Sequence, residues 1–232
     1  MKKILIFAII TLVFTSCWAQ TELMHQDVKE NGLGKSGPNL KNFSHFYAGF
    51  GFVAGASDSI GSNIIAGKST NFVLGYRYKL RICNFYAIGF DAAYNSYSYT
   101  LKQESAKITP DTILHDKEKL SLGNLGLSGY MRFNYGKRGN RVGNFIDLGG
   151  YGDWRIFGTN FTRDKMENDN IVRTTISHLN YFNDINYGAL VRVGFNRYVF
   201  FGTYRFSDIF VPSKKYPEFP RLTVGLQIGI HK

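Results

Sequence analysis

The sequence predicts an all-β fold, an eight-stranded antiparallel up-and-down transmembrane β-barrel preceded by an N-terminal signal peptide. Three observations predict it. From Phe43 onward, apolar and polar residues alternate with a period of two, which is typical of strands and not of helices. The connections between the alternating segments are short and long in turn. Aromatic residues make up 16% of the 232 residues, a composition that excludes a chain disordered throughout.

Residues 1–19 have the parts of a secretory signal peptide. Lys2 and Lys3 precede an apolar run over 4–14, and Ala19 ends the short stretch after which cleavage is expected. A helix of this length spans about 16 Å, which is too short for a hydrocarbon core of about 30 Å. Lipid attachment at Cys17 is the alternative. We expect export, followed by a flexible polar leader over 20–42 and a barrel over 43–232.

Eight segments alternate strictly between apolar and polar residues and are predicted to be strands. They cover residues 46–55, 71–82, 86–95, 124–135, 146–156, 185–196, 198–207 and 221–231. In the last of them, for example, Leu222 and Val224 alternate with Thr223 and Gly225. An even number of antiparallel strands can close on itself, so we expect a sheet without edges.

The connections separate the two ends of this sheet. Tight turns are expected at 83–84, 136–141 and 196–197. Long polar loops are expected over 57–68, 100–117, 157–183 and 209–220. Because the two kinds of connection alternate along the chain, all the long loops should lie at one end.

Residue size indicates which face of the sheet points outward. One face of each segment carries bulky Phe, Tyr, Leu and Ile, and the other carries Gly, Ser, Asn and Ala interspersed with charge. A soluble carrier would place the apolar face inside, but the interior of eight strands is only just wide enough for side chains. Arg or Lys in the middle of the lipid face costs about 2–4 kcal/mol, and the bulky faces have none there. We therefore expect a membrane barrel with its bulky face outside.

Aromatic residues cluster at the ends of the segments, as they do at membrane interfaces. The predicted girdle consists of Tyr78, Tyr86, Tyr135 and Tyr198 beside the short turns, and Trp154 near the long loops. Tyr is also a good strand former, which is the alternative explanation.

Charged residues on the small-residue face are predicted to line the lumen. The basic members are Arg77, Lys79, Arg81, Arg132, Arg155, Arg192, Arg205 and Arg221, and the acidic members are Asp91, Asp147 and Asp153. Arg–Asp pairs would satisfy one another and plug a narrow barrel. A small anion-selective conduit is the alternative, since rings of positive charge line anion pores.

Enzyme and metal motifs are missing from the sequence. None of the five histidines has a metal-ligand spacing, and two cysteines are too few for a zinc site. Ser177 and His178, with Asp184 nearby, could serve a lipid-modifying enzyme, but neighbours on a strand point to opposite faces. We expect no enzyme activity, no metal and no cofactor. The formal net charge of +11 does not indicate nucleic-acid binding, because the chain should be embedded in a membrane.

These features together resemble the small bacterial outer-membrane β-barrel family (OmpA/OmpX-like), over about Phe43 to Lys232. Barrels of the PorT type, linked to type IX secretion, are a more specific resemblance, carried by the Ala19-Gln20 junction and the segment 39–43. The resemblance implies that the short turns and the leader face the periplasm and the long loops face outside. The chain departs from the family in ending on His231 and Lys232 without a terminal Phe.

The expected function is that of a non-enzymatic outer-membrane barrel with a plugged polar lumen. It would be a scaffold or subunit of an envelope or secretion machine, or a surface-binding protein that acts through its long loops. The expected partners are outer-membrane lipid and protein subunits of such a complex. The alternative is a lipid-modifying enzyme or a small anion-selective conduit.

Overall fold

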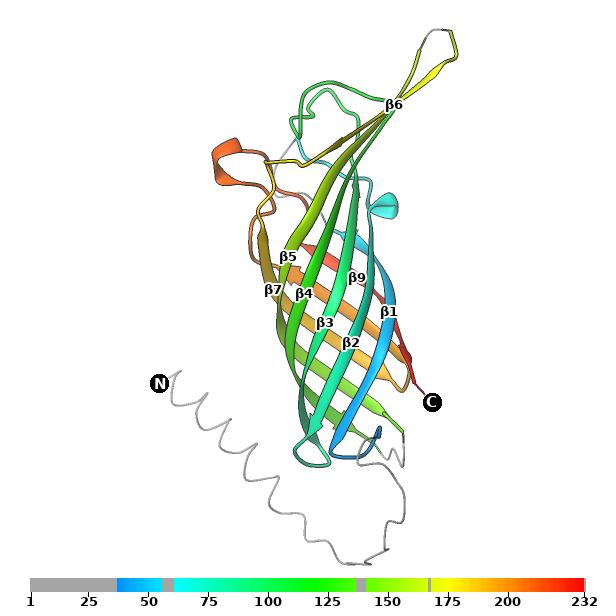
Figure 1. Ribbon diagram of the computed structural model, residues 1–232, viewed down its shortest axis with the longest axis vertical. Coiled ribbons are helices and arrows are strands. Elements are labelled where there is room, and N and C mark those ends of the chain that lie inside the picture. Colours follow the sequence, from blue (N-terminus) through cyan, green and yellow to red (C-terminus); the bar gives the residue numbers. More distant parts are fainter. Residues whose placement is uncertain (1–36, 56–60, 137–140, 167, 232) are drawn as a thin grey trace, which may run out of the picture.

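The computed structural model describes residues 37–55, 61–136, 141–166 and 168–231. The predicted signal peptide (1–19) and the first part of the predicted leader (20–36) lie outside the described residues. The described chain is all-β, with two short 3₁₀ turns and no α-helix (Figure 1). None of its helices is long and apolar enough to span a membrane.

The strands are β1 (Asn42–Ala54), β2 (Thr70–Arg81), β3 (Tyr86–Thr100), β4 (Lys117–Tyr135), β5 (Asn144–Lys165), β6 (Ile171–Ser177), β7 (Ile185–Phe195), β8 (Tyr198–Arg205) and β9 (Leu222–Ile230). The 3₁₀ turns are η1 (Ala66–Lys68) and η2 (Pro212–Lys214).

Eight of these strands form a closed ring in the order β1, β2, β3, β4, β5, β7, β8, β9 and back to β1. Every neighbouring pair is antiparallel. The ring closes where β1 pairs with β9, from Phe46 opposite Ile230 to Ala54 opposite Leu222. The predicted all-β, antiparallel, eight-stranded arrangement is therefore confirmed, and ring closure leaves these eight strands without free edges.

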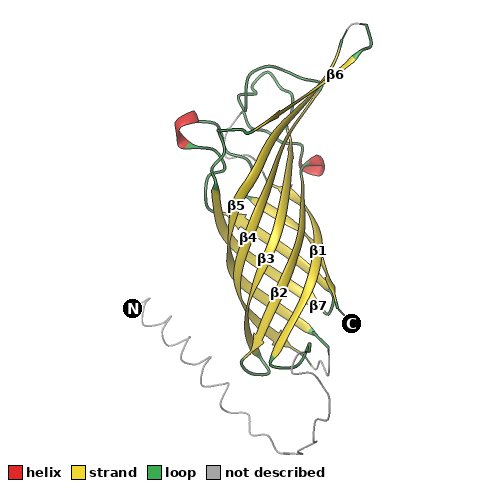
Figure 2. Ribbon diagram, in the orientation of Figure 1, coloured by secondary structure: helices red, strands yellow, loops and turns green. Residues whose placement is uncertain are grey.

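The prediction of a long loop over 157–183 is wrong in part. β5 continues to Lys165, and the chain turns back as β6, which pairs only with β5, from Thr159 opposite Ser177 to Lys165 opposite Ile171. The β-branched run Ile171–Ser177 favours a strand, although the surrounding polar residues obscure its alternation. We call β6 and the adjoining parts of β4 (117–121) and β5 (159–165) the outer extension; it projects beyond the ring (Figure 2).

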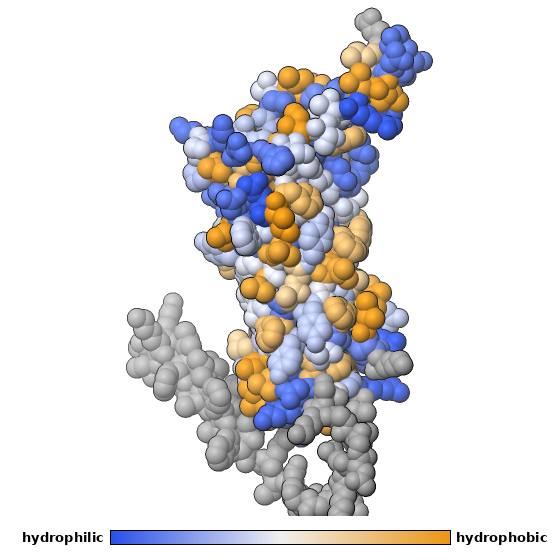
Figure 3. All heavy atoms as spheres, viewed as in Figure 1, coloured by the Kyte–Doolittle hydropathy of each residue, from blue (hydrophilic) through white to orange (hydrophobic). Residues whose placement is uncertain are grey.

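The bulky residues of the strands point away from the axis of the ring, as expected. Leu127, Trp154 and Phe200 are 70%, 66% and 57% exposed, whereas their strand neighbours Asp153 and Phe201 are buried. Figure 3 shows apolar patches on the outer surface of the ring. The inner face carries buried charged residues: Arg77, Asp91, Arg132, Asp147 and Arg192.

The long connections pack over one end of the ring in an apolar cluster that we call the outer lid. Its buried members are Val53, Ile64, Tyr99, Leu101, Leu120, Leu122, Leu179, Phe182, Ile209, Phe210 and Phe219. The rings of Phe182 and Phe210 stack at 5.3 Å, and those of Tyr99 and Phe219 stack at 4.7 Å. Tyr99 and Phe219 are buried, so this end of the ring is covered by closely packed apolar side chains.

The opposite end of the ring is partly covered by residues 37–41, the end of the predicted leader. Gly37 N–H donates to the Asn42 carbonyl at 2.9 Å, which closes a turn just before β1. Lys79 Nζ donates to the Pro38 carbonyl, so a side chain from inside the ring holds this turn. β1 begins at Asn42, one residue before the predicted start of the barrel.

Candidate functional site: the interior charge network

Five charged side chains meet in the middle of the ring. Arg77 Nε and Arg132 Nε lie 3.0 and 2.7 Å from the carboxylates of Asp91 and Asp147, respectively. Arg132 is bidentate, with a second bond from Nη2 to Asp147 Oδ2 at 2.8 Å. Arg192 contacts both carboxylates, through Nη2 to Asp91 and through Nη1 to Asp147 at 3.5 Å. We call these five residues the central network.

The central network follows from strand register and ring closure. Arg77 lies opposite Asp91 on β2 and β3, and Asp147 lies between Arg132 on β4 and Arg192 on β7. Directly opposed residues share a face, so each carboxylate meets an arginine across a neighbouring strand. Arg192 then reaches Asp91 across the interior, which only a closed ring permits. Three guanidinium groups and two carboxylates leave one excess positive charge.

Aromatic rings line the same level of the interior. The guanidinium of Arg77 lies 4.2 Å from the Tyr47 ring, and that of Arg132 lies 3.5 Å from the Phe145 ring. Tyr130 lies between two guanidinium groups and donates its hydroxyl to the Tyr78 carbonyl at 2.9 Å. Such contacts stabilise cations that are shielded from water. Together with the ion pairs they place buried aromatic and charged side chains at the middle level of the ring.

Asp153 lies apart from the central network, nearer the outer lid. It is 2% exposed, accepts a bond from Asn95 Nδ2 at 2.8 Å and has no ion pair within the described chain. A Cβ on Gly126 would lie 2.3 Å from Asp153 Oδ1, so this contact requires a glycine there. Asp153 lines a small internal cavity of about 50 Å³ that also contacts Arg192. A cavity of this size can hold only a few water molecules.

The other predicted lumen residues lie near the ends of the ring. Arg81 donates to Asn39 Oδ1 at one end, and Arg155 pairs with Asp184 at 2.5 Å at the other. Arg221 pairs with Asp208 at 2.6 Å. Lys79 holds the turn at 37–41, as described above. These residues bind loop residues at the ends of the ring and are not members of the central network.

Arg205 links the interior to the outer lid. It pairs with Glu218 at 2.9 Å and donates to the carbonyls of Ser207 and Phe219 at 3.0 and 3.2 Å. Glu218 in turn accepts the backbone N–H groups of Ile209 and Phe210. Glu218 could not be predicted from the sequence, because it lies in a loop whose path depends on the packing of the whole outer lid.

The predicted girdle residues lie on the outer surface, the four tyrosines near the ends of their strands and Trp154 midway along β5, where its pairing with β7 ends. Tyr135, Tyr198 and Trp154 are exposed, and Tyr78 and Tyr86 are partly exposed. Tyr78 donates its hydroxyl to Asn42 Oδ1 at 2.7 Å, and its ring lies against that of Phe90.

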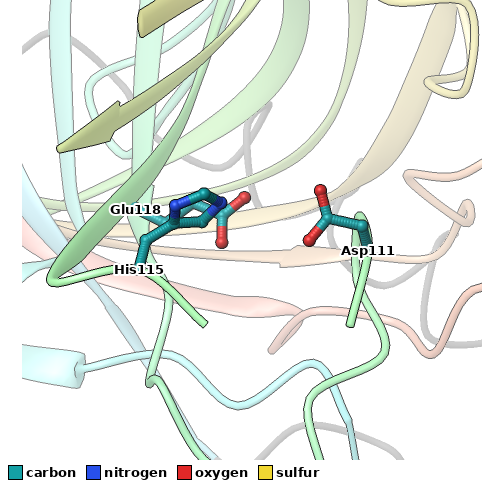
Figure 4. Close-up of side chains that lie close together, drawn as sticks. All are labelled: Asp111, His115 and Glu118. Carbon is teal, nitrogen blue, oxygen red and sulfur yellow. The ribbon is translucent and has the colours of Figure 1, made fainter. Parts of the chain in front are cut away.

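A second polar cluster, not predicted from the sequence, lies in the long β3–β4 connection and at the start of β4. Carboxylate and imidazole atoms of Asp111, His115 and Glu118 lie within 4.8 Å of one another, close enough to hold a metal ion (Figure 4). The buried ammonium of Lys107, however, contacts Glu118 Oε2 at 2.5 Å and Asp111 Oδ1 at 3.3 Å. His115 Nδ1 is bonded to Asp164 at 2.9 Å. A lysine already provides the cation here, so the cluster is better suited to anchoring the loop than to binding metal.

Ser177, His178 and Asp184 line one open hollow of about 440 Å³ beside Arg155. Asp184 accepts from Arg155, and no hydrogen bond in the described chain joins Ser177, His178 and Asp184 to one another. The three residues therefore lack the hydrogen-bonded relay of a nucleophile, a base and an orienting carboxylate.

Comparison with protein-family models and with curated proteins finds no match for this chain.

Proposed function

We propose that this chain is an integral outer-membrane β-barrel with a plugged lumen, which acts without catalysis through its outer loops. It would serve as a scaffold or subunit of an envelope or secretion machine, or as a surface-binding protein. The observation that carries the proposal is the contrast between an apolar outer belt and an ionic, filled interior.

The outer belt supports the membrane location. Bulky apolar side chains cover the outward face of all eight ring strands, and soluble proteins rarely expose apolar patches of such extent. Every strand of the ring is paired on both sides, which a lipid-exposed sheet requires. The flanking Tyr and Trp residues suit the two membrane interfaces.

The filled interior argues against a conduit. The central network obstructs the middle of the ring and the outer lid covers one end. An anion would have to separate buried Arg–Asp pairs before it could pass. We therefore assign function to the surfaces that extend beyond the apolar outer belt of the ring. The outer extension is the largest of these surfaces with regular secondary structure.

Site-specific photo-crosslinking in intact cells tests this proposal. A photoreactive residue at Val172, which is exposed on β6, should give a discrete protein adduct. The matched position is Tyr204, which is exposed to a similar degree on the ring and should give lipid adducts or none. Recovery of the chain in the soluble fraction, or failure of every outer-extension position to crosslink to protein, would contradict the proposal.

A lipid-modifying enzyme is the second candidate, favoured only by the hollow that Ser177, His178 and Asp184 share. It predicts that the purified chain changes the mass of outer-membrane lipids and that Ser177→Ala abolishes the change. Mass spectrometry of lipid incubated with either form decides between the two functions.

A further inference from the structure

β6 is the one strand in the described chain that has an unpaired edge. Ring strands are paired on both sides, whereas β6 pairs with β5 alone. All seven of its residues are exposed, including Ile171, Val172 and Ile176. Along such an edge, alternate residues direct unpaired N–H and C=O groups outward, which makes it a template for another strand.

A row of three cations crosses the outer extension and ends at this edge. Lys117 on β4 lies opposite Arg163 on β5, and Arg163 lies opposite Arg173 on β6. Directly opposed residues share a face, so the three side chains are neighbours, and Lys119 lies on the same face two residues along β4. None of these four side chains has an ion pair or a hydrogen bond in the described structure. Like charges directly opposite one another are destabilising.

The described acidic groups near this row already contact other partners. Glu118 contacts Lys107, Asp164 contacts His115, and Asp169 contacts Lys165 at 2.6 Å. Asp116 accepts the backbone N–H of Lys165 at 2.7 Å. Among the described residues, no carboxylate is ion-paired with the row, which leaves its positive charge available to an acidic group of another molecule.

We propose that the free edge of β6 binds an extended, acidic segment of a partner protein as an added strand. An acidic residue of that segment opposite Arg173 would lie next to the last cation of the row. Its carboxylate would offset the positive charge of Arg173. Apolar residues at alternate positions of the segment would lie beside Val172 and Ile176 on the opposite face. A second copy of this chain fits less well, because self-pairing would bring two cationic rows together. The inference rests on the proposed function, since it names the chemistry of the partner bound by the outer loops.

Peptide binding to the purified full-length exported chain, folded in zwitterionic detergent, tests this inference without reference to the cell. The probe is a fluorescent seven-residue peptide in which Glu alternates with Val. One control peptide carries Lys in place of Glu. A second keeps every Glu but has N-methyl groups at alternate backbone positions, which removes donors from one edge. Fluorescence anisotropy should show binding of the acidic peptide and at least about tenfold weaker binding of each control.

Charge reversal at Arg173 provides the test on the protein side. Arg173→Glu places a carboxylate opposite Arg163, so the hairpin should remain folded while affinity for the acidic peptide falls about tenfold. Lys68→Glu is the matched control, because Lys68 is exposed on η1 and has no ion pair with any described residue. The affinity of this variant should match that of the unaltered chain.

Each other outcome overturns the inference. Equal binding of the N-methylated peptide would show simple charge attraction and no strand addition. Equal loss in both variants would place the site elsewhere. A peptide-independent dimer that Arg173→Glu disrupts would identify a second copy as the occupant. The crosslinking experiment can fail while this binding succeeds, so the two proposals are separable.

Discussion

Breaking the ion pair between Arg132 and Asp147 should destabilise the chain more than any surface charge change. Asp147 is fully buried and accepts two bonds from Arg132, with Arg192 Nη1 3.5 Å away. Asp147→Asn keeps the side-chain shape but raises the excess charge of the central network from one to two. Removing one partner of a buried pair costs about 3–5 kcal/mol, and we expect a loss of unfolding free energy of that size.

The double variant Arg132→Met/Asp147→Asn should recover most of this loss. It restores the excess charge to one and places Met against the Phe145 ring, which now lies 3.5 Å from the guanidinium. Replacing both members of a buried pair is often close to neutral. The two single variants and the double variant form a thermodynamic cycle that isolates the interaction.

Urea unfolding in phospholipid vesicles, followed by Trp154 fluorescence, provides the measurement. The control is Glu104→Gln, in an ion pair with Lys102 whose side chains are 46% and 49% exposed; its cost should stay below about 1 kcal/mol. If Asp147→Asn costs no more than this control, or if the two single changes simply add in the double variant, the argument for an ionic plug is refuted.

Three further predictions concern packing, the loop anchor and conduction. Gly149→Ala should lower the unfolding temperature sharply, because a Cβ there would lie 2.1 Å from the Gly129 carbonyl oxygen. Gly129→Ala, with nothing within 4 Å of the added carbon, should stay close to the unaltered chain in gel-shift assays of thermal unfolding. Lys107→Ala removes the only ammonium contacting buried Glu118 among the described residues, so proteolysis within 100–117 should accelerate and terbium luminescence should appear. Equal luminescence from the unaltered chain would contradict that reasoning. In planar bilayers the unaltered chain should give no discrete conductance steps, and regular steps would show that the interior opens.

The ring strands could be predicted from sequence because side-chain direction in a strand has a period of exactly two residues. Bulky and small residues occupy opposite faces of each strand, which places Arg77 and Asp91 on the same inner face. The tight turn at 83–84 implies that their strands are neighbours. The contact between Arg192 and Asp91 was not predictable in the same way, because it depends on ring closure and on the direction of a long side chain.

The loops resisted prediction for a different physical reason. β6 contains a β-prone run, but its charged and polar neighbours offer no buried face, so periodicity gives little signal. The contacts Lys107–Glu118 and Arg205–Glu218 join residues whose relative position is set by the packing of the outer lid. Such contacts depend on where the strands of the ring position the ends of each loop, which the local sequence does not determine.

Fluorescence quenching by brominated lipids tests most directly whether bulky side chains face lipid. Trp154 is exposed near one end of the ring, whereas Leu127 is 70% exposed further along the neighbouring strand toward its centre. In bilayers, lipid brominated near the headgroup should quench Trp154 most strongly, and lipid brominated along the acyl chain should quench a Trp154→Phe/Leu127→Trp variant most strongly. Quenching of both chains by aqueous iodide, with no effect of either brominated lipid, would contradict the account.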